Sequence, residues 1–319
     1  MKIPEKLIII ALLFICCSCS TGKLICVLSL DGPVNGKELR PTRRMVEGRY
    51  PGINAWYDSL RLEGVFKDTV IMTEDGVNLH AVYAGKEDGK DAVVLFHGYG
   101  VNHIAMLHFA RLYRDSLDFN VIVPDLRHHG QSGGESVTMG VFDCRDGLRW
   151  VEMAHSIWNS DFVMAHGVSM GAATTMMMSG LGNLPGYLRC FVEDCGYTSV
   201  WDEFESVRVN YTPFGKNAVR EANDYCLETY GWDFRSVAPI YRVADCSLPT
   251  LFIHGNPDNF VPTESVYSLF NAKKRGYKDI WISEGTKQHA VAYLTNMQAY
   301  TDRVRSFIRK VKELDAIPE

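Results

Sequence analysis

One serine stands where the chain could carry a strong nucleophile. Ser169 lies at the centre of GVSMG (167–171), after an apolar run (162–166) and before a run of small residues and methionines (172–179). This order predicts a strand, a sharp turn and a helix, with the serine in a strained conformation at the turn. Its hydroxyl would then sit at a helix N-terminus, whose amides favour developing negative charge. We interpret Ser169 as a nucleophile; the alternative is a glycine-rich turn that only packs the helix on the strand.

A serine hydroxyl needs a base, and the base needs an acid to orient it. The stretch 251–258 predicts a strand that runs into a loop ending at Asp258, and the loop 285–290 places His289 just before a final helix. Both follow strand ends, where α/β sheets place their sites. We predict Asp258 as the orienting acid and His289 as the base. The alternatives are that Asp258 only caps the next helix, that Asp194 replaces it, or that His289 only caps its helix.

Attack by a serine on a carbonyl creates an oxyanion, which needs hydrogen-bond donors. The stretch FHGYG (96–100) follows a short apolar run, and its glycines would let the Tyr99 amide point into the site. The amide of Met170, directly after the serine, would be the second donor. We interpret His97 as a structural histidine that braces the loops.

A third stretch, PDLRHHGQSGG (124–134), holds two adjacent histidines. Adjacent side chains diverge and no third ligand has a suitable spacing, so we predict no metal site. Asp125 and Arg127 are expected to form a structural ion pair or hydrogen bonds that hold the loop.

The elements that must position these residues follow a regular order. Two strand-like runs (67–73 and 78–84) flank an Asp-Gly pair, which predicts a hairpin. Short apolar runs then alternate with helical patterns up to a closing helix at 291–311. This alternation predicts an α/β fold with a mostly parallel sheet and helices on both faces.

The segment 198–247 breaks the alternation, because it is rich in aromatic and charged residues and longer than a simple crossover. It predicts a small helical cap over the site; the alternative is a longer crossover helix with a surface excursion. The expected regions are a signal peptide (1–19), a tether and edge segment with a short helix (20–66), a core (67–197 and 248–319) and the cap (198–247).

The N-terminus predicts export. An uninterrupted apolar run (7–17) is too short to span a bilayer comfortably and has the length of the apolar part of a signal peptide. The following Cys-Cys-Ser-Cys is similar to a bacterial lipoprotein box, with Cys19 as the best candidate for lipidation. We expect a membrane-anchored lipoprotein that faces the periplasm or the cell surface. An ordinary cleaved signal peptide and an uncleaved signal anchor stay open.

Composition excludes some classes of function. A net charge of -5 and the lack of a basic stripe argue against a nucleic-acid partner. Nine cysteines are present, but none has metal-ligand spacing. A disulfide between Cys226 and Cys246 is conceivable in an exported chain, although free, buried thiols are the favoured interpretation.

Together, HGYG, DLRHHGQS, GVSMG, HGNPDNFVP and the late histidine resemble the α/β-hydrolase superfamily. They are most similar to its bacterial serine hydrolases near the prolyl-oligopeptidase-type peptidases, serine aminopeptidases and monoglyceride-lipase-like enzymes. The resemblance covers about residues 67–312. It implies a catalytic triad, no cofactor, and hydrolysis of an ester, amide or thioester.

Three hypotheses for function follow. The first is a serine hydrolase that cleaves a carboxylic ester through an acyl-enzyme, with an apolar or aromatic group under the aromatic cap. The second is an aminopeptidase or amidase for small substrates, in which Glu203, Glu205 or Glu221 would hold a substrate amine. The third, which an intact triad disfavours, is a lipid-anchored scaffold with an inactive hydrolase fold.

Overall fold

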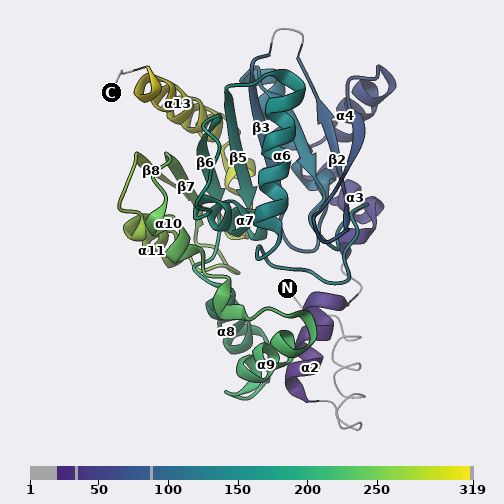
Figure 1. Cartoon of the computed structure of the whole chain (residues 1–319), viewed down its shortest axis with the longest axis vertical. Helices are drawn as coiled ribbons and strands as arrows, with labels where there is room; N and C mark the ends of the chain where they lie inside the picture. The colour runs from purple at the N-terminus through teal and green to yellow at the C-terminus, as the bar shows by residue number, and fades with distance from the viewer. Residues whose placement is uncertain (1–19, 33–34, 87–88, 317–319) are drawn as a thin grey trace.

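The computed structural model describes residues 20–32, 35–86 and 89–316. Its strands are β1 (Lys67–Met72), β2 (Asn78–Ala84), β3 (Asp91–Phe96), β4 (Asn120–Pro124), β5 (Phe162–Val168), β6 (Leu188–Asp194), β7 (Thr250–Asn256) and β8 (Lys278–Glu284). They form one sheet in the order β1-β2-β4-β3-β5-β6-β7-β8 (Figure 1). Strands alternate with helices along the chain, which confirms the predicted α/β class.

The strands are parallel except at one edge of the sheet. β1 and β2 form an antiparallel hairpin with Met72 opposite Asn78, and β2 runs antiparallel to β4. All other neighbours in the sheet are parallel. Gly76 of the hairpin turn has a φ of 80°, a left-handed conformation that glycine adopts without steric cost. The Asp-Gly pair therefore marks the turn, as predicted.

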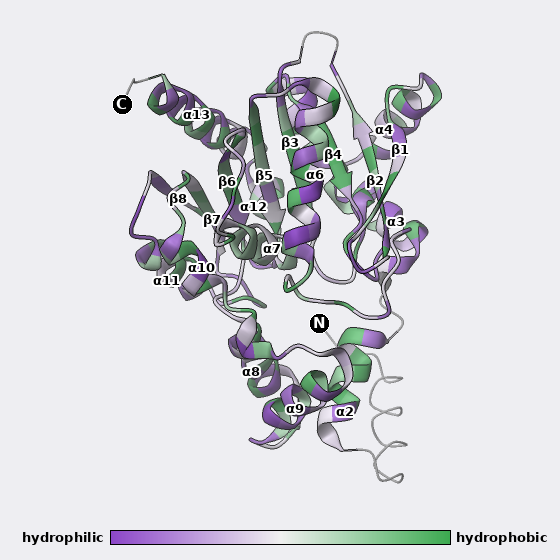
Figure 2. Ribbon diagram, in the orientation of Figure 1, coloured by the Kyte–Doolittle hydropathy of each residue, from purple (hydrophilic) through white to green (hydrophobic). Residues whose placement is uncertain are grey.

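Helices cover both faces of the sheet. One layer contains α3 (Leu39–Arg49), α4 (Ile53–Leu62), α5 (Leu107–Arg111), α12 (Ala292–Thr295) and α13 (Met297–Asp315), and the other contains α6 (Asp143–Trp158), α7 (Met170–Ser179), α10 (Pro239–Asp245) and α11 (Glu264–Ala272). Alternate residues of β3 show the division: Val94 and Phe96 pack with α6 and α7, whereas Val93 and Leu95 pack with α4, α5 and α13. All four are fully buried. Figure 2 accordingly shows apolar residues concentrated in the central strands.

The segment 198–247 forms α8 (Val200–Tyr211), α9 (Ala218–Tyr230), a short 3-10 turn (Phe234–Ser236) and α10. In Figure 1, α8 and α9 lie beyond the end of the sheet. Phe204 of α8 packs on Phe234, with ring centroids 4.4 Å apart. In contrast, Val243 of α10 belongs to an apolar cluster with α7 and α11. Only part of the segment therefore stands outside the helical layers.

A short helix near the start of the described chain, α2 (Thr21–Cys26), docks on α9. Gly22 lies so close that a Cβ there would be 2.2 Å from the carbonyl carbon of Glu221. The Cys26 thiol donates a hydrogen bond to the carbonyl of Ala222 at 3.1 Å. The sequence predicts only a tether and an edge segment for residues 20–66, so this docking is a finding of the structure.

The described residues hold six free, buried cysteines: Cys26, Cys144, Cys190, Cys195, Cys226 and Cys246. Cys226 and Cys246 are thus separate thiols. Cys19 and the rest of the predicted export signal (1–19) lie outside the described residues, and export with lipid anchoring stays a prediction. Among the helices of the described residues, none combines the length and the apolar character that a membrane crossing requires.

Gly171→Ala is expected to destabilise the protein, because the new Cβ would lie 2.1 Å from the carbonyl oxygen of Phe96. Relief requires α7 to move away from β3, so we expect the free energy of unfolding to fall by about 3 kcal/mol. Urea denaturation followed by circular dichroism measures the change. The control is Gly182→Ala, where a Cβ meets nothing within 4 Å. Equal stability of the two variants would contradict the close approach.

Candidate active site

Ser169 occupies the turn between β5 and α7. Its φ of 57° and ψ of -116° are strained for a residue with a side chain. The turn is possible because Gly167 and Gly171 are in contact: a Cβ on Gly167 would lie 2.0 Å from the Gly171 carbonyl oxygen. The Ser169 amide donates to the carbonyl oxygen of Asp194 at 2.8 Å. The predicted strand, turn and helix are present, and the hydroxyl is held in a fixed place.

The structure brings His289 and Asp258 to this serine. His289 Nε2 lies 2.7 Å from Ser169 Oγ, and its Nδ1 lies 2.7 Å from Asp258 Oδ2. A carboxylate can only accept, so Nδ1 carries the hydrogen and Nε2 accepts from the serine hydroxyl. The imidazole is therefore in the tautomer that a base requires.

Each oxygen of Asp258 has a separate task. Oδ2 accepts from His289, while Oδ1 accepts from the amides of Phe260 and Val261 at 2.8 and 3.1 Å. The helix that follows, α11, is preceded by Thr263 rather than by Asp258. Holding the local turn and orienting the histidine are therefore compatible roles of one carboxylate.

Asp194 makes no hydrogen bond with His289. Its Oδ2 accepts from the Tyr300 hydroxyl at 2.8 Å. Burial raises the pKa of Asp194 to about 7, so this carboxyl is partly protonated near neutral pH. Of the two carboxyls that the sequence offered as the acid, the structure brings only Asp258 to the histidine.

The loop that carries Tyr99 borders the serine. A Cβ on Gly98 would lie 3.3 Å from Ser169 Cβ. His97 Nδ1 donates to the Gly98 carbonyl at 2.7 Å, and its Nε2 accepts from the Leu126 amide at 3.0 Å. Because C=O and N–H point in opposite directions across a trans peptide, the Tyr99 N–H points away from His97. Neither this amide nor that of Met170 finds an acceptor among the described residues.

A second histidine holds the next peptide of this loop. His129 Nε2 accepts from the Gly100 amide at 3.2 Å, and its Nδ1 donates to the Arg127 carbonyl at 2.8 Å. Burial lowers the pKa of His129 to about 4 and that of His97 to about 3. Both rings are therefore neutral at neutral pH, and each offers one donor and one acceptor. The bracing role predicted for His97 agrees with these contacts.

Of the two alternatives predicted for Asp125 and Arg127, the ion pair between them is wrong, whereas hydrogen bonds that hold the loop are present: the Asp125 carboxylate accepts from the Gln131 amide at 3.0 Å. Arg127 pairs with Asp146 and Asp75, each at 2.6 Å. The side chains of Asp125 and Arg127 therefore point in different directions, which their spacing in the sequence does not reveal.

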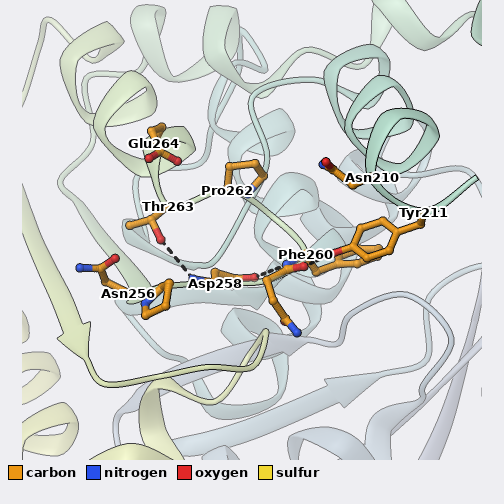
Figure 3. A pocket seen from close by; sticks show the side chains of 10 residues that line it. Asn210, Tyr211, Asn256, Asp258, Phe260, Pro262, Thr263 and Glu264 are labelled. Atoms are coloured by element: carbon orange, nitrogen blue, oxygen red, sulfur yellow. Dashed lines mark hydrogen bonds between the residues drawn. The ribbon is translucent and has the colours of Figure 1, made fainter. Parts of the chain in front are cut away.

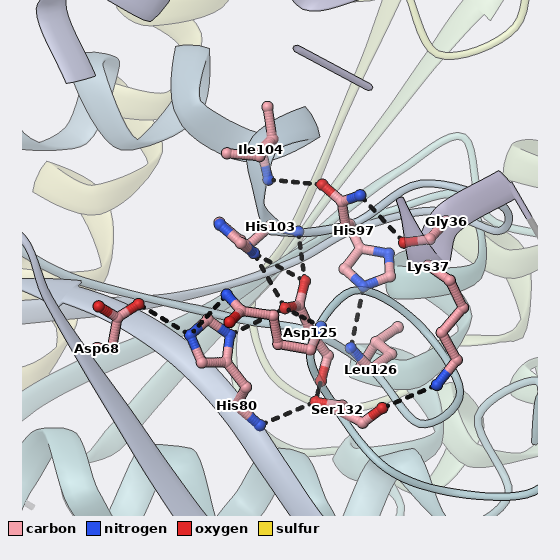
Figure 4. Close-up of polar contacts among 12 residues, drawn as sticks. Gly36, Lys37, Asp68, His80, His97, His103, Ile104, Asp125, Leu126 and Ser132 are labelled. Carbon is pink, nitrogen blue, oxygen red and sulfur yellow. Dashed lines mark hydrogen bonds and ion pairs between the residues drawn. The ribbon is translucent and has the colours of Figure 1, made fainter. Parts of the chain in front are cut away.

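Asp125 instead forms hydrogen bonds with two histidines (Figure 4). Its carboxylate accepts from His80 Nδ1 at 2.9 Å, and from the amide and Nδ1 of His103 at 2.7 and 2.9 Å. His80, His103 and Asp125 could in principle hold a metal ion, since their ligand atoms lie within 4.8 Å of one another. These atoms are already paired with one another, and His80 Nε2 pairs with Asp68 at 3.0 Å. The cluster is therefore satisfied as a hydrogen-bonded support for the loop that starts at residue 97.

Two further side chains near His289 were missed from the sequence. The Phe260 ring lies 5.4 Å from the imidazole, measured between centroids. Cys195 Sγ lies 4.0 Å from His289 Nε2. Burial raises the pKa of the Cys195 thiol well above its usual range, so it packs as a neutral group. No pattern in the sequence marks either residue, because both reach the site through loop geometry.

A cavity of about 500 Å³ borders the Asp258 loop (Figure 3). Asn210 and Tyr211, at the end of α8, line it together with Asp258 and Phe260. The Tyr211 hydroxyl donates to the carbonyl of Asn259, which ties α8 to this loop. Ser169 and His289 do not line this cavity.

Comparison with known proteins supports the fold. No protein-family model matches the chain. The chain is 27% identical to the YqkD protein of Bacillus subtilis over 246 residues, which covers 76% of this chain and 79% of that protein. It is 24% identical to the α/β-hydrolase domain-containing protein WAV2 of Arabidopsis thaliana, covering 82% and 84% of the two chains.

A solved structure has the same architecture. The esterase Pf2001 of Pyrococcus furiosus matches with a TM-score of 0.60 at 23% identity, covering 77% of this chain and 92% of that one. A likeness at this identity concerns the fold alone. The strand order, the serine turn between β5 and α7 and these relatives agree with one another. The chain therefore has the α/β-hydrolase fold.

Proposed function

We propose that this protein is a serine hydrolase that cleaves carboxylic esters through an acyl-enzyme intermediate. The observation that carries the proposal is the continuous hydrogen-bond relay from Asp258 through His289 to Ser169, with two distances of 2.7 Å. Such a relay supplies a nucleophile, a base in the correct tautomer and an acid that stabilises the imidazolium.

The reaction has two halves. His289 takes the proton of Ser169 as Oγ attacks the ester carbonyl, and then gives that proton to the departing alcohol. The acyl group remains on Oγ. Water, deprotonated by His289, attacks the acyl-enzyme, and the proton returns to Ser169 as the acid leaves. Asp258 holds the imidazole in place through both halves and compensates its positive charge.

We assign the oxyanion site to the amides of Tyr99 and Met170. Three observations support the assignment: both amides lack an acceptor among the described residues, Met170 begins α7, and Gly98 borders the serine. His97 and His129 fix the peptides on either side of Tyr99. The Tyr99 amide therefore needs little reorganisation when negative charge develops on the substrate oxygen.

An ester is favoured over an amide as the substrate because an alcohol leaves more readily than an amine. Cleavage of an ester therefore depends less than cleavage of an amide on protonation of the leaving group by His289. Cleavage of small amides or peptides by the same relay is the second candidate.

Ser169→Ala is expected to abolish labelling by a fluorophosphonate probe and to lower kcat for p-nitrophenyl butyrate by about 10⁴-fold or more. The reason is that the acceptor of the acyl group is lost. Ser179→Ala, in the same helix, is the control, since its hydroxyl only bonds the Met176 carbonyl. Labelling that persists in Ser169→Ala, or folded wild type that is never labelled, would overturn the proposed function.

Asp258→Asn is expected to lower kcat by about 10³- to 10⁴-fold, because an amide stabilises the wrong imidazole tautomer. Asp194→Asn should change kcat only a few-fold, since Asp194 bonds Tyr300 rather than His289. Steady-state hydrolysis of p-nitrophenyl butyrate by the two variants measures the difference. The reverse order of effects would transfer the role of the acid to Asp194.

His129→Ala is expected to lower kcat about 10-fold with little change in KM, because the loop donor acts mainly in the transition state. His129→Gln should retain more activity, since its Oε1 can accept from the Gly100 amide as Nε2 does now. Thermal denaturation of both variants checks that the fold is intact. If kcat in both variants equals that of wild type, the histidine does not position the donor.

A further inference from the structure

Two aromatic residues beside the candidate site are exposed to solvent, although they come from distant segments of the chain. Tyr211 ends α8 and is 41% exposed, and Phe260 lies on the loop of Asp258 and is 39% exposed. Their ring centroids lie 6.2 Å apart, and the Tyr211 hydroxyl donates to the carbonyl of Asn259. Figure 3 shows the two side chains together. We call this pair, Tyr211 and Phe260, the aromatic surface.

The aromatic surface reaches the reacting groups through Phe260. The centroid of its ring lies 5.4 Å from that of His289, and the same side chain lines the cavity of about 500 Å³ together with Tyr211. The Phe260 amide donates to Asp258 Oδ1 at 2.8 Å. The carboxylate that orients the imidazole therefore also fixes the backbone that carries the ring. Phe260 thus connects the base with the cavity.

The second side chain beside the imidazole offers no comparable surface. Cys195 Sγ lies 4.0 Å from His289 Nε2, but Cys195 is only 1% exposed. Phe260, in contrast, presents its ring to the open cavity. Apolar surface that is exposed next to reacting groups is stabilised when an apolar part of a ligand covers it.

The chemistry of the proposed reaction decides which part of the substrate meets this surface. Attack by Ser169 Oγ gives a tetrahedral carbon that carries the oxyanion, the alcohol oxygen and the acyl chain. In the proposed mechanism the oxyanion accepts from the amides of Tyr99 and Met170. The alcohol oxygen must lie within hydrogen-bond distance of His289 Nε2, because it receives its proton from there. The alcohol is therefore the part of the substrate that lies beside the imidazole, and Phe260 flanks the imidazole.

We propose that the aromatic surface binds the alcohol part of the substrate, which makes esters of aromatic alcohols the preferred substrate class. This inference rests on the proposed function and deepens it. An aromatic ring bonded near the alcohol oxygen can pack on Phe260, since such rings favour stacked or edge contacts with centroids about 4.5–7 Å apart. Asn210 and Glu264 also line the cavity, so polar substituents on the alcohol can be accommodated.

The test places a phenyl ring on either side of the ester bond. Ethyl butyrate carries no ring, benzyl butyrate carries it on the alcohol, and ethyl 4-phenylbutyrate carries it on the acid. Ethanol and benzyl alcohol are similar in acidity, so the two leaving groups differ mainly in shape. A pH-stat at neutral pH measures kcat/KM for each ester with wild type, Phe260→Ala, Phe260→Tyr and Tyr241→Ala. Tyr241 of α10 is 73% exposed and is the control for loss of an exposed ring.

Wild type is expected to prefer benzyl butyrate to ethyl butyrate by about 10-fold or more in kcat/KM. Phe260→Ala should lower this ratio by about 10-fold, because the ring is removed while the amide bonded to Asp258 is kept. Phe260→Tyr should retain most of the preference, since an aromatic ring remains. The ratio of ethyl 4-phenylbutyrate to ethyl butyrate should be the same in Phe260→Ala and wild type. Tyr241→Ala should match wild type with all three esters.

An equal fall in kcat/KM for all three esters in Phe260→Ala would mean that Phe260 only positions His289, and would overturn the inference. A fall confined to ethyl 4-phenylbutyrate would overturn it too, as would a wild type that does not prefer the benzyl ester. Hydrolysis of ethyl butyrate in these cases leaves the proposed function standing. If wild type cleaves none of the three esters and takes no fluorophosphonate label, the proposed function fails and the inference fails with it.

Discussion

The close approach of two glycines beneath Ser169 is the constraint on which the rest of the site depends. With Gly167 and Gly171 in contact, α7 can begin directly at the end of β5, and its first turn can lie against the carbonyl of Phe96. The serine then takes a backbone conformation that a side chain normally avoids. Packing of α7 between the sheet and its helical neighbours offsets this strain. The geometry of the nucleophile is therefore a property of the whole core and not of a local loop.

Burial acts on the titratable groups around the serine in a consistent way. It keeps His97 and His129 neutral, so each can donate on one side and accept on the other. It also leaves Asp194 partly protonated. Asp258 is buried too, but it accepts two backbone amides and the imidazole. His97 and His129 thus support the loops as neutral groups. Asp258 differs from them because hydrogen bonds from two amides and from His289 hold its carboxylate.

The sequence was most informative where a steric requirement leaves a local signature. The glycines around Ser169, the Asp-Gly turn and the alternating apolar runs each reflect a short-range constraint, so the sheet class and the serine turn could be predicted. The chain order of Ser169, Asp258 and His289 also survives in the linear sequence, because each follows a strand end.

The remaining features depend on contacts between distant segments. The pairing of Arg127 with Asp146 and Asp75 needs side-chain directions that spacing does not encode. The positions of Cys195 and Phe260 beside His289 depend on how two loops bend. Glu203 could be named as a candidate from the sequence, but the burial of its Oε1 atom without a hydrogen-bond partner among the described residues appears only when its neighbours are placed.

The docking of α2 on α9 has a consequence for the order in which the molecule assembles. The hydrogen bond from Cys26 to Ala222 closes a separation of 196 residues. Closing a loop of this length carries an entropy cost that rises slowly with the number of residues in the loop. During synthesis α2 must wait, with its apolar face unpaired, until α9 has emerged from the ribosome. The N-terminal helix is therefore among the first parts of the described chain to be made, but its docking site is completed only after most of the sheet has been synthesised.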